Sequence, residues 1–237
     1  MTLFSSPLRR GMASLFVFFA LVFANSYSAV AGGVLLGATR VIYSQGDKQA
    51  SLAVKNTDDK LRYLIQTWVE DKGGKKSSDF IITPPLFVSN AKSENTLRIV
   101  YVGGALPTDR ESVYYLNSKA IPEFDKDKLE NKNVLKMAVL TRIKIFVRPK
   151  DLALMSESAP EALKFHFDGS KLTIDNPTPY YVSLVQFYVG GKEQPNTLVA
   201  PKGKTIVNTG NSIKRDITYK AVNDYGAITK KYNGVLF

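Results

Sequence analysis

The stretch from Asn133 to Pro149 constrains the fold of this chain more than any other segment. Its alternation of apolar with mixed positions has the period of a β-strand, and β-branched residues are plentiful in it. At roughly 3.3 Å per residue such a strand would span about 50 Å, whereas a typical strand spans about 17–20 Å. The apolar row occupies the odd positions Leu135, Met137, Val139, Thr141, Ile143, Ile145 and Val147, and the even positions include the cations Lys136, Arg142, Lys144 and Arg148.

The length of this strand leaves two interpretations open. A strand can run through the core of a β-sandwich and be buried along its whole length. Alternatively, part of it lies at a sheet edge, where unpaired backbone groups and apolar side chains would invite pairing with another chain. On the second interpretation, a partner protein uses the strand.

The first 31 residues have the composition of a secretory signal peptide. Arg9 and Arg10 precede an uncharged apolar run from Met12 to Phe23, and small residues then lead to Ala31. The pattern predicts cleavage after Ala31 and export from the cytoplasm. An uncleaved anchor is the alternative, but the run is shorter than the roughly 20 residues of a membrane span. We therefore expect no membrane insertion of the mature chain.

The chain is basic and has no cysteine, and both facts narrow the class of protein. Removing the two arginines of residues 1–31 from the net charge of +11 leaves about +9. The cationic residues are scattered and form no stripe interleaved with aromatic residues, so we expect a solvated basic surface rather than a nucleic-acid partner. The lack of cysteine in an exported chain favours the bacterial periplasm over the disulfide-rich extracellular class.

From Gly32 onward, short alternating apolar segments are separated by turn residues at a spacing of roughly 8–12 residues, which is typical of an all-β fold. The segments up to Pro149 predict an immunoglobulin-like sandwich, with Trp68 as its core aromatic residue. The predicted strands are Val34–Tyr43, Gln49–Lys55, Tyr63–Glu70, Phe80–Ile82, Thr96–Val102, Val113–Ser118 and the long stretch described above.

The second half repeats this pattern and predicts a second, smaller sandwich. Pro149 removes a donor from the β-ladder and should end the long strand, so we expect a domain boundary near Lys150. The mature chain is thereby divided into residues 32–150 and residues 151–237. The predicted strands of the second part are Leu163–Phe167, Lys171–Asp175, Tyr181–Gly190, Thr197–Ala200, Gly203–Val207, Ile213–Val222 and Lys231–Phe237.

The sequence offers little for catalysis. Its only histidine, His166, alternates with Phe165 and Phe167, so we expect it to point outward from a strand rather than to act as a base or a metal ligand. The sequence contains no nucleophile-elbow, phosphate-binding or calcium-loop motif. We therefore expect a binding protein and not an enzyme, without a metal or another cofactor.

Binding by β-strand addition is the function that best suits the long strand. Backbone hydrogen bonds along an edge supply affinity, and alternate apolar side chains set the register. A cation beside the edge can hold the terminal carboxylate of a partner by charge-assisted hydrogen bonds. Arg142 and Lys144 lie on the strand and Arg40 lies alone in an apolar segment, although a lone arginine is more often a surface residue or a member of an ion pair.

Nine short segments, taken in order, resemble the periplasmic chaperones of the chaperone–usher pilus pathway, the PapD-like family. Each segment is weak evidence by itself, but together they extend over nearly the whole mature chain. They are Thr39–Tyr43, Tyr63–Val69, Thr83–Pro85, Asp109–Ser112, Tyr115–Asn117, Ile121–Pro122, Ile143–Pro149, Asn176–Tyr181 and Asn223–Gly226.

The resemblance implies two immunoglobulin-like domains in a boomerang arrangement with a cleft between them. It also implies binding of pilin subunits, which lack a final strand and receive the long strand of the first domain, and their delivery to an outer-membrane usher. Neither ATP nor a cofactor is implied. The resemblance favours the short-loop branch of the family, although Glu123 stands where the family usually has a second proline.

The resemblance also assigns roles to individual residues. The donor residues that would enter the subunit fall on Leu135, Met137 and Val139. The cations that would hold the C-terminal carboxylate of the subunit fall on Arg40 and Lys144. A charged network that would link the domains and fix their angle falls on Glu111, Arg148 and Asp224. Without the resemblance, a solvated surface position is the alternative for each of these charges.

A second function stays open on the sequence alone. A secreted two-domain adhesin, or a structural fimbrial component, would bind a host ligand directly and would need an aromatic-lined site instead of an exposed donor strand. Self-association of the free chain through the exposed strand is also compatible with the pattern.

Overall fold

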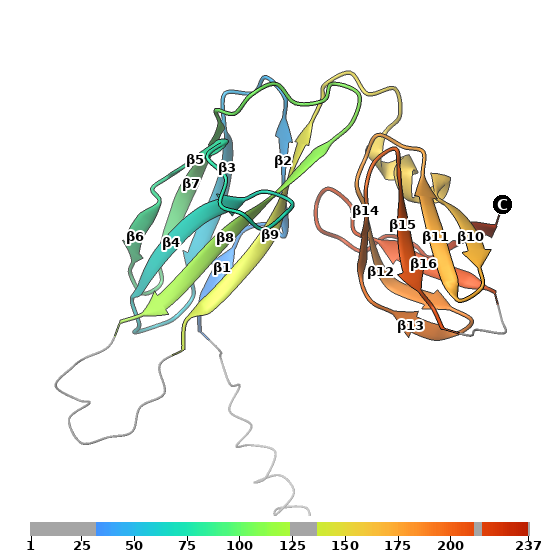
Figure 1. Cartoon of the computed structure of the whole chain (residues 1–237). Coiled ribbons are helices and arrows are strands. Elements are labelled where there is room, and N and C mark those ends of the chain that lie inside the picture. The colour runs from blue at the N-terminus through green and yellow to red at the C-terminus, as the bar shows by residue number, and fades with distance from the viewer. Residues whose placement is uncertain (1–31, 124–136, 211–214, 237) are drawn as a thin grey trace, which may run out of the picture. The chain divides into compact units, whose positions relative to one another are not determined.

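The computed structural model describes residues 32–123, 137–210 and 215–236, and nearly all regular structure within them is β (Figure 1). The predicted signal peptide and the predicted donor residue Leu135 lie outside the described residues. The residues from Gly33 onward form one compact unit, in which the strands build two sandwiches. This confirms the all-β, immunoglobulin-like class. No helix of the described residues is both apolar enough and long enough to cross a membrane.

The first sandwich packs a four-stranded sheet of order β1-β3-β7-β5 against a five-stranded sheet of order β2-β9-β8-β4-β6 (Figure 1). All pairs are antiparallel except β2 with β9, which is parallel. The strand bounds are β1 Val34–Leu36, β2 Arg40–Ser44, β3 Ala50–Asn56, β4 Tyr63–Glu70, β5 Phe80–Thr83, β6 Leu86–Ser89, β7 Glu94–Tyr101, β8 Ser112–Pro122 and β9 Val139–Arg148.

The core of this sandwich lies between its two sheets and is built by alternate residues of each strand. Leu97 and Ile99 of β7 are fully buried, as are Leu116 of β8 and Ile145 of β9. Each such side chain contributes about 1.5–3 kcal/mol to folding when it leaves water. The ring of Tyr43 packs edge-on against Phe80, and Phe80 packs edge-on against Tyr114. The period-two pattern of the sequence is thus the pattern of core-facing residues.

The predicted strand Val34–Tyr43 is wrong as a single element, because the chain passes from one sheet to the other within it. β1 pairs with β3 in the four-stranded sheet, whereas β2 pairs with β9 in the five-stranded sheet. The crossing lies at residues 37–39, where a Cβ on Gly37 would come within 3.0 Å of the Ala53 side chain. Glycine therefore permits the close approach of the two strands at the crossing.

Trp68 is not the core aromatic residue that the sequence predicts. Ile65 and Val69 of β4 are buried, and Trp68 lies on the opposite parity, half-buried, with its Nε1 donating to Glu70 Oε1 at 2.9 Å. Alternation fixes which residues share a face, and the apolar odd positions of β4 take the core face. Tyr43, Phe80 and Tyr114 supply the core aromatic rings instead.

Two local features near the end of β8 were not predicted. β6 pairs with β4; its Leu86 and Val88 side chains are exposed, and Phe87 between them is half-buried against the core. Glu123, in the place of the family's usual second proline, donates its backbone N–H to Arg62 O at 2.9 Å. A proline could not make this bond.

The second sandwich packs a sheet of order β15-β11-β10-β18 against a sheet of order β13-β12-β16-β17, with β14 pairing to β12 (Figure 1). Its core includes Phe165, Leu172, Ile174, Leu184, Phe187 and Tyr219. The element bounds are η2 Ser156–Ala162, β10 Lys164–Asp168, β11 Lys171–Asn176, β12 Val182–Val189, β13 Lys192–Gln194, β14 Thr197–Val199, β15 Gly203–Asn208, β16 Ile217–Ala221, β17 Tyr232–Asn233 and β18 Val235–Leu236.

The sequence predicts most of these strands but not their finer divisions. The predicted terminal strand is two short strands, and Gly234 lies between them, where a Cβ would meet the Ile217 side chain at 2.7 Å. The short 3₁₀ helix η2 and the strand β13 were not predicted. His166 is exposed on β10, which confirms the expected outward orientation.

Candidate functional site

The apolar row of β9 changes its surroundings halfway along the strand. Ile143 and Val147 are buried and Ile145 is 0% exposed, because they face the core of the first sandwich. On the same row Val139 is 58% exposed, and Met137, which precedes the strand, is 64% exposed. The two halves have the same sequence pattern but different neighbours.

The exposed half of β9 also has an unpaired backbone edge. On one side, β8 pairs with β9 from Val139 to Val147. On the other side, β2 pairs with β9 only from Lys144 to Arg148. Within the part of the chain that the structure describes, no strand pairs with residues 139–143 on that side. An edge strand that presents free N–H and C=O groups beside exposed apolar side chains can accept another strand.

Arg40 and Lys144 lie directly opposite each other in the parallel register, at the point where β2 begins to pair with β9. Arg40 is 9% exposed, and its Nη1 donates to the backbone oxygen of Val222 at 2.8 Å. Its buried Nε has no hydrogen-bond partner among the described residues. Neither cation forms an ion pair with a described carboxylate. The guanidinium therefore keeps unused donor capacity.

Burial and mutual repulsion both act against the charge on these two cations. Burial lowers the pKa of Lys144, and the nearby charges of Arg40 and Arg142 lower it further. Burial also lowers the pKa of Arg40, although Asp224 and Glu111 partly offset this effect. Two cations in this position would be stabilised by an anion that reaches both.

Arg142 is the other cation of the long strand that the sequence marks as a candidate anchor, and it already has partners within the protein. Its Nη2 lies 3.1 Å from Glu70 Oε2, and its guanidinium lies 4.0 Å from the centre of the Tyr115 ring. The structure therefore separates Lys144 from Arg142, which the sequence could not do.

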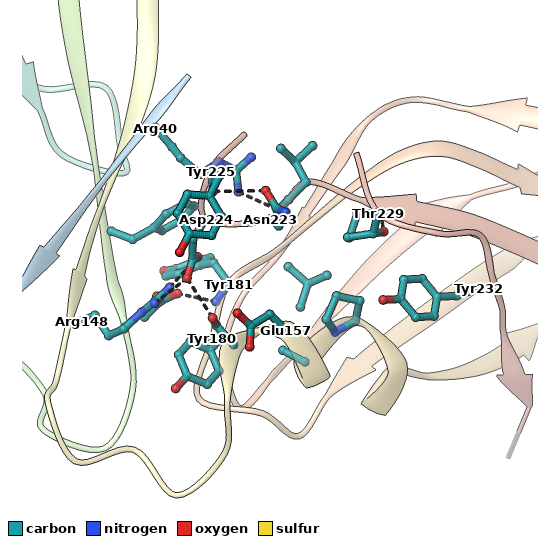
Figure 2. A pocket seen from close by; sticks show the side chains of 18 residues that line it. Arg40, Arg148, Glu157, Tyr180, Tyr181, Asn223, Asp224, Tyr225, Thr229 and Tyr232 are labelled. Carbon is teal, nitrogen blue, oxygen red and sulfur yellow. Dashed lines mark hydrogen bonds and ion pairs between the residues drawn. The ribbon is translucent and has the colours of Figure 1, made fainter. Parts of the chain in front are cut away.

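Glu111, Arg148 and Asp224 are brought together in one hydrogen-bonded network. Arg148 Nε donates to Glu111 Oε1 at 2.8 Å, and its Nη1 and Nη2 donate to the two carboxylate oxygens of Asp224 at 2.7 and 2.8 Å. Figure 2 shows Arg148 and Asp224 joined in this way. Because Glu111 and Arg148 belong to the first sandwich and Asp224 to the second, the network links the two.

The two carboxylates of the network respond differently to burial. Burial raises the pKa of Glu111, which is almost fully enclosed, and the charge of Arg148 only partly opposes this. Burial also acts on Asp224, but hydrogen bonds from Arg148, the charge of Arg148 and the hydroxyl of Ser156 together hold the pKa of Asp224 below its ordinary value.

Several contacts around this network were not predicted from the sequence. Ser156 Oγ donates to Asp224 Oδ2 at 2.8 Å, and the backbone N–H of Tyr181 donates to Glu111 Oε2 at 2.8 Å. Lys202 pairs with Asp109 at 2.8 Å, which is a second ion pair between the sandwiches. Asp109 and Tyr181 lie within segments that carry the family resemblance, whereas nothing in the sequence marks Lys202 or Ser156.

A cavity of about 140 Å³ lies beside these residues, and Figure 2 shows the side chains that line it. Arg40, Arg148, Tyr181 and Asp224 are among them, and Lys144 is not. Among the described residues, no cluster of histidine, aspartate and glutamate side chains could hold a metal ion. The arrangement offers cations, aromatic faces and a free strand edge, which suit an extended peptide with a terminal carboxylate.

Comparison with family models places nearly all of both sandwiches in one family. The model described as a pili and flagellar-assembly chaperone, PapD N-terminal domain, matches residues 33–153. The model described as a pili assembly chaperone PapD, C-terminal domain, matches residues 158–233.

Individual relatives agree with the family models. The Escherichia coli chaperone protein FocC is 48% identical over 227 residues, which cover 95% of this chain and 97% of FocC. The crystal structure of the periplasmic chaperone SfaE is 48% identical, with a TM-score of 0.75 over 86% of this chain and 100% of that chain. A Salmonella enterica structure of the SafA pilin in complex with the SafB chaperone matches at 31% identity, with a TM-score of 0.78 over 88% of this chain and 99% of that chain.

Proposed function

The chain belongs to the PapD family of pilus-assembly chaperones, and from this premise we propose how it holds a fimbrial subunit. It is a chaperone that binds fimbrial subunits by donor-strand complementation, and membership of this family also confirms that it is not an enzyme. The alternative of a secreted adhesin is not favoured, because the relatives that span the chain are chaperones. The individual residues that perform the binding are our proposal.

The free edge of β9 beside two cations that lack carboxylate partners is the observation that carries the proposal. A strand of the subunit pairs with the edge at residues 139–143, and the exposed side chains of Met137 and Val139 enter the subunit. Leu135 would continue this row, but it lies outside the described residues. Main-chain hydrogen bonds give affinity, and the alternate side chains give the register.

Arg40 and Lys144 hold the C-terminal carboxylate of the subunit in this proposal. Support comes from their position at the end of the free edge, from the burial of Arg40 and the half-burial of Lys144, and from the absence of a described carboxylate within ion-pair distance. A carboxylate would relieve the repulsion between them and use the donor capacity of Arg40. The Glu111, Arg148 and Asp224 network then fixes the relative orientation of the two sandwiches.

Cellular context forms a further part of the proposal. The chain works in the periplasm after removal of residues 1–31, passes its subunit to an outer-membrane usher, and can self-associate through the free edge. The composition of residues 1–31 and the periplasmic description of SfaE support the location. The match to the N-terminal domain model ends at residue 153, and the match to the C-terminal domain model begins at residue 158. These bounds support a division of the mature chain into residues 32–150 and 151–237.

Loss of either anchor cation tests the carboxylate assignment. We expect Arg40→Ala and Lys144→Ala each to lower the recovery of a co-expressed fimbrial subunit in the periplasmic complex by on the order of tenfold, since each removes a charge-assisted contact. Lys171→Ala, which removes an exposed cation of β11, is the matched control. Quantitative pull-down with mass identification of the subunit measures the effect. Recovery equal to that of the control would refute the anchor.

A further inference from the structure

The surroundings of Arg40 raise the question of what fixes its guanidinium group. An arginine side chain has several rotatable bonds, and holding it in one geometry costs conformational entropy. Arg40 has only one hydrogen bond from its guanidinium to a described residue, the bond to Val222 O. A single bond leaves the plane of the guanidinium free to rotate about the donor, so a further contact is needed to orient it.

Phe146 supplies such a contact. The carbon atom at the centre of the Arg40 guanidinium lies 5.7 Å from the centre of the Phe146 ring, which is within the range of a cation–π interaction. Phe146 follows Lys144 by two residues on β9, so both point to the same face of the sheet. This face is not the core face, yet Phe146 is buried.

Tyr181 of the second sandwich covers Phe146 and connects it to the charged network. The two rings are stacked, with their centres 5.6 Å apart and their planes inclined by 27°. The backbone N–H of Tyr181 donates to Glu111, which in turn accepts from Arg148. Figure 2 shows Tyr181 close to Arg148 and Asp224. A continuous series of contacts thus joins the network to the ring beneath the guanidinium.

We propose that Phe146 and Tyr181 are positioning residues, which hold the guanidinium of Arg40 ready for the carboxylate of the subunit. This inference rests on the proposed anchor role of Arg40. The second sandwich contributes both the Val222 oxygen and the Tyr181 ring, so the anchor is complete only when the two sandwiches are in contact. Phe146 and Tyr181 act through Arg40 and do not themselves bind the carboxylate.

The affinity of the chain for a peptide with a free C-terminal carboxylate, compared with the same peptide ending in a carboxamide, distinguishes two roles for these rings. One role is to position Arg40, and the other is only to pack the fold. The probe is an N-acetylated peptide with two lysines followed by four valine-threonine pairs, ending in either group. Its affinity for the full chain is measured by calorimetry. We expect Phe146→Leu and Tyr181→Leu to lower the affinity for the acid by about 3–30-fold and to leave the affinity for the amide unchanged. Tyr181→Phe keeps the aromatic ring, so its preference for the acid peptide over the amide peptide should equal that of the native chain. Arg40→Ala measures how much of this preference is lost when the guanidinium itself is removed.

Each other outcome overturns the inference in a distinguishable way. An unchanged acid-over-amide preference in both leucine variants would show that the rings do not position Arg40. An equal loss for acid and amide would show that they only pack the fold. If the native chain has no preference for the acid, or Arg40→Ala keeps it, the anchor assignment itself is wrong and the positioning role is lost with it. Thermal unfolding verifies that each variant is folded, and Tyr181→Leu, at a half-buried position, serves if Phe146→Leu does not fold.

Discussion

At the scale of the residue, the contrast between Lys144 and Arg142 separates an anchor from a structural ion pair. Both are cations on the same face of β9, two residues apart. Arg142 is satisfied by Glu70 and by the Tyr115 ring, whereas Lys144 faces Arg40 and has no carboxylate partner among the described residues. A half-buried cation that faces another cation is costly by itself, and a function that brings an anion explains why the chain retains it.

Binding of a carboxylate should change the titration of Lys144. In the free chain burial, followed by repulsion from Arg40 and Arg142, holds the pKa of Lys144 below its ordinary value. A bound carboxylate favours the ammonium form, so we expect this pKa to rise when the acid peptide is present and to stay unchanged with the amide peptide. Affinity for the acid should be full below the pKa of the free chain and fall as the pH rises through it. A titration of ¹³C-labelled lysine by NMR measures both, and a pKa that stays constant or falls with the acid would contradict the assignment.

At the scale of the element, β9 performs two tasks because its neighbour β2 covers only part of it. The part of β9 that pairs with β2 runs from Lys144 to Arg148. Residues 139–143, which precede it, pair with β8 only, and their edge carries the exposed apolar side chains of Val139 and Leu140. Natural proteins usually protect such edges against pairing with other chains. Here the unprotected edge is the proposed binding surface. Within the described residues β9 has 10 residues, so it is shorter than the strand that the sequence predicts from Asn133 to Pro149.

Substitutions in the two halves of β9 should therefore affect different properties. We expect Val139→Asp to abolish capture of the subunit while changing the free energy of unfolding by no more than about 0.5 kcal/mol, because the side chain is exposed. Ile145→Ala removes a fully buried side chain and should cost about 2–5 kcal/mol of stability. Periplasmic pull-down and urea unfolding measure the two properties.

The matched control for this test is Ile206→Asp on β15. Ile206 is 65% exposed and also lies on an edge strand, but in the second sandwich. The Ile206→Asp substitution should leave capture of the subunit unchanged. Normal capture by Val139→Asp, or an equal loss in both aspartate variants, would argue against specific use of the β9 edge.

At the scale of the whole molecule, contacts between the two sandwiches hold the candidate site together. Arg148 joins Glu111 to Asp224, Arg40 reaches the Val222 oxygen, and a Cβ on Gly226 would collide with Thr39, so the loop after β16 lies directly on the first sandwich. Desolvation offsets much of the attraction in a buried charged network, so we attribute to it a defined geometry rather than a large gain in stability.

Removal of the Asp224 carboxylate should weaken these contacts in a pH-dependent way. We expect Asp224→Asn to lower the free energy of unfolding by about 1–3 kcal/mol at neutral pH, because a charge-assisted bidentate pair with Arg148 is lost. The folded-state pKa of Asp224 lies below its ordinary value of 3.8, so its contribution is complete above that pH and is lost as the pH falls through the folded pKa. The difference in the free energy of unfolding between the native chain and Asp224→Asn should therefore become smaller as the pH falls.

Urea unfolding at pH 7 and at pH 2 measures this difference. Asp109→Asn, which breaks the exposed ion pair with Lys202, is the control and should change the urea midpoint little at either pH. A difference between the native chain and Asp224→Asn that stays the same at both pH values would show that the charge of Asp224 does not stabilise the fold.

The sequence by itself determined the fold class, most strands and the parity of each residue. Alternation predicted the β-strands, and Pro149 predicted the end of β9, which the structure places at Arg148. The outward orientation of His166 followed from the same rule. These features are local, because a period of two and the missing donor of proline act within a few residues. The family resemblance added the candidate residues, three of which the structure joins in one network.

The tertiary structure alone decided which faces and edges are covered. Val139 and Ile145 have the same place in the sequence pattern, yet Val139 is exposed and Ile145 is buried, because of the two only Ile145 packs into the core between the sheets of the first sandwich. Trp68 points away from the core for a similar reason, since alternation gives the parity of a residue but not the face that is buried. Val222, whose oxygen accepts from Arg40, and Asp224, which accepts from Arg148, lie in the second sandwich, far away in the sequence, and only folding brings them to these arginines.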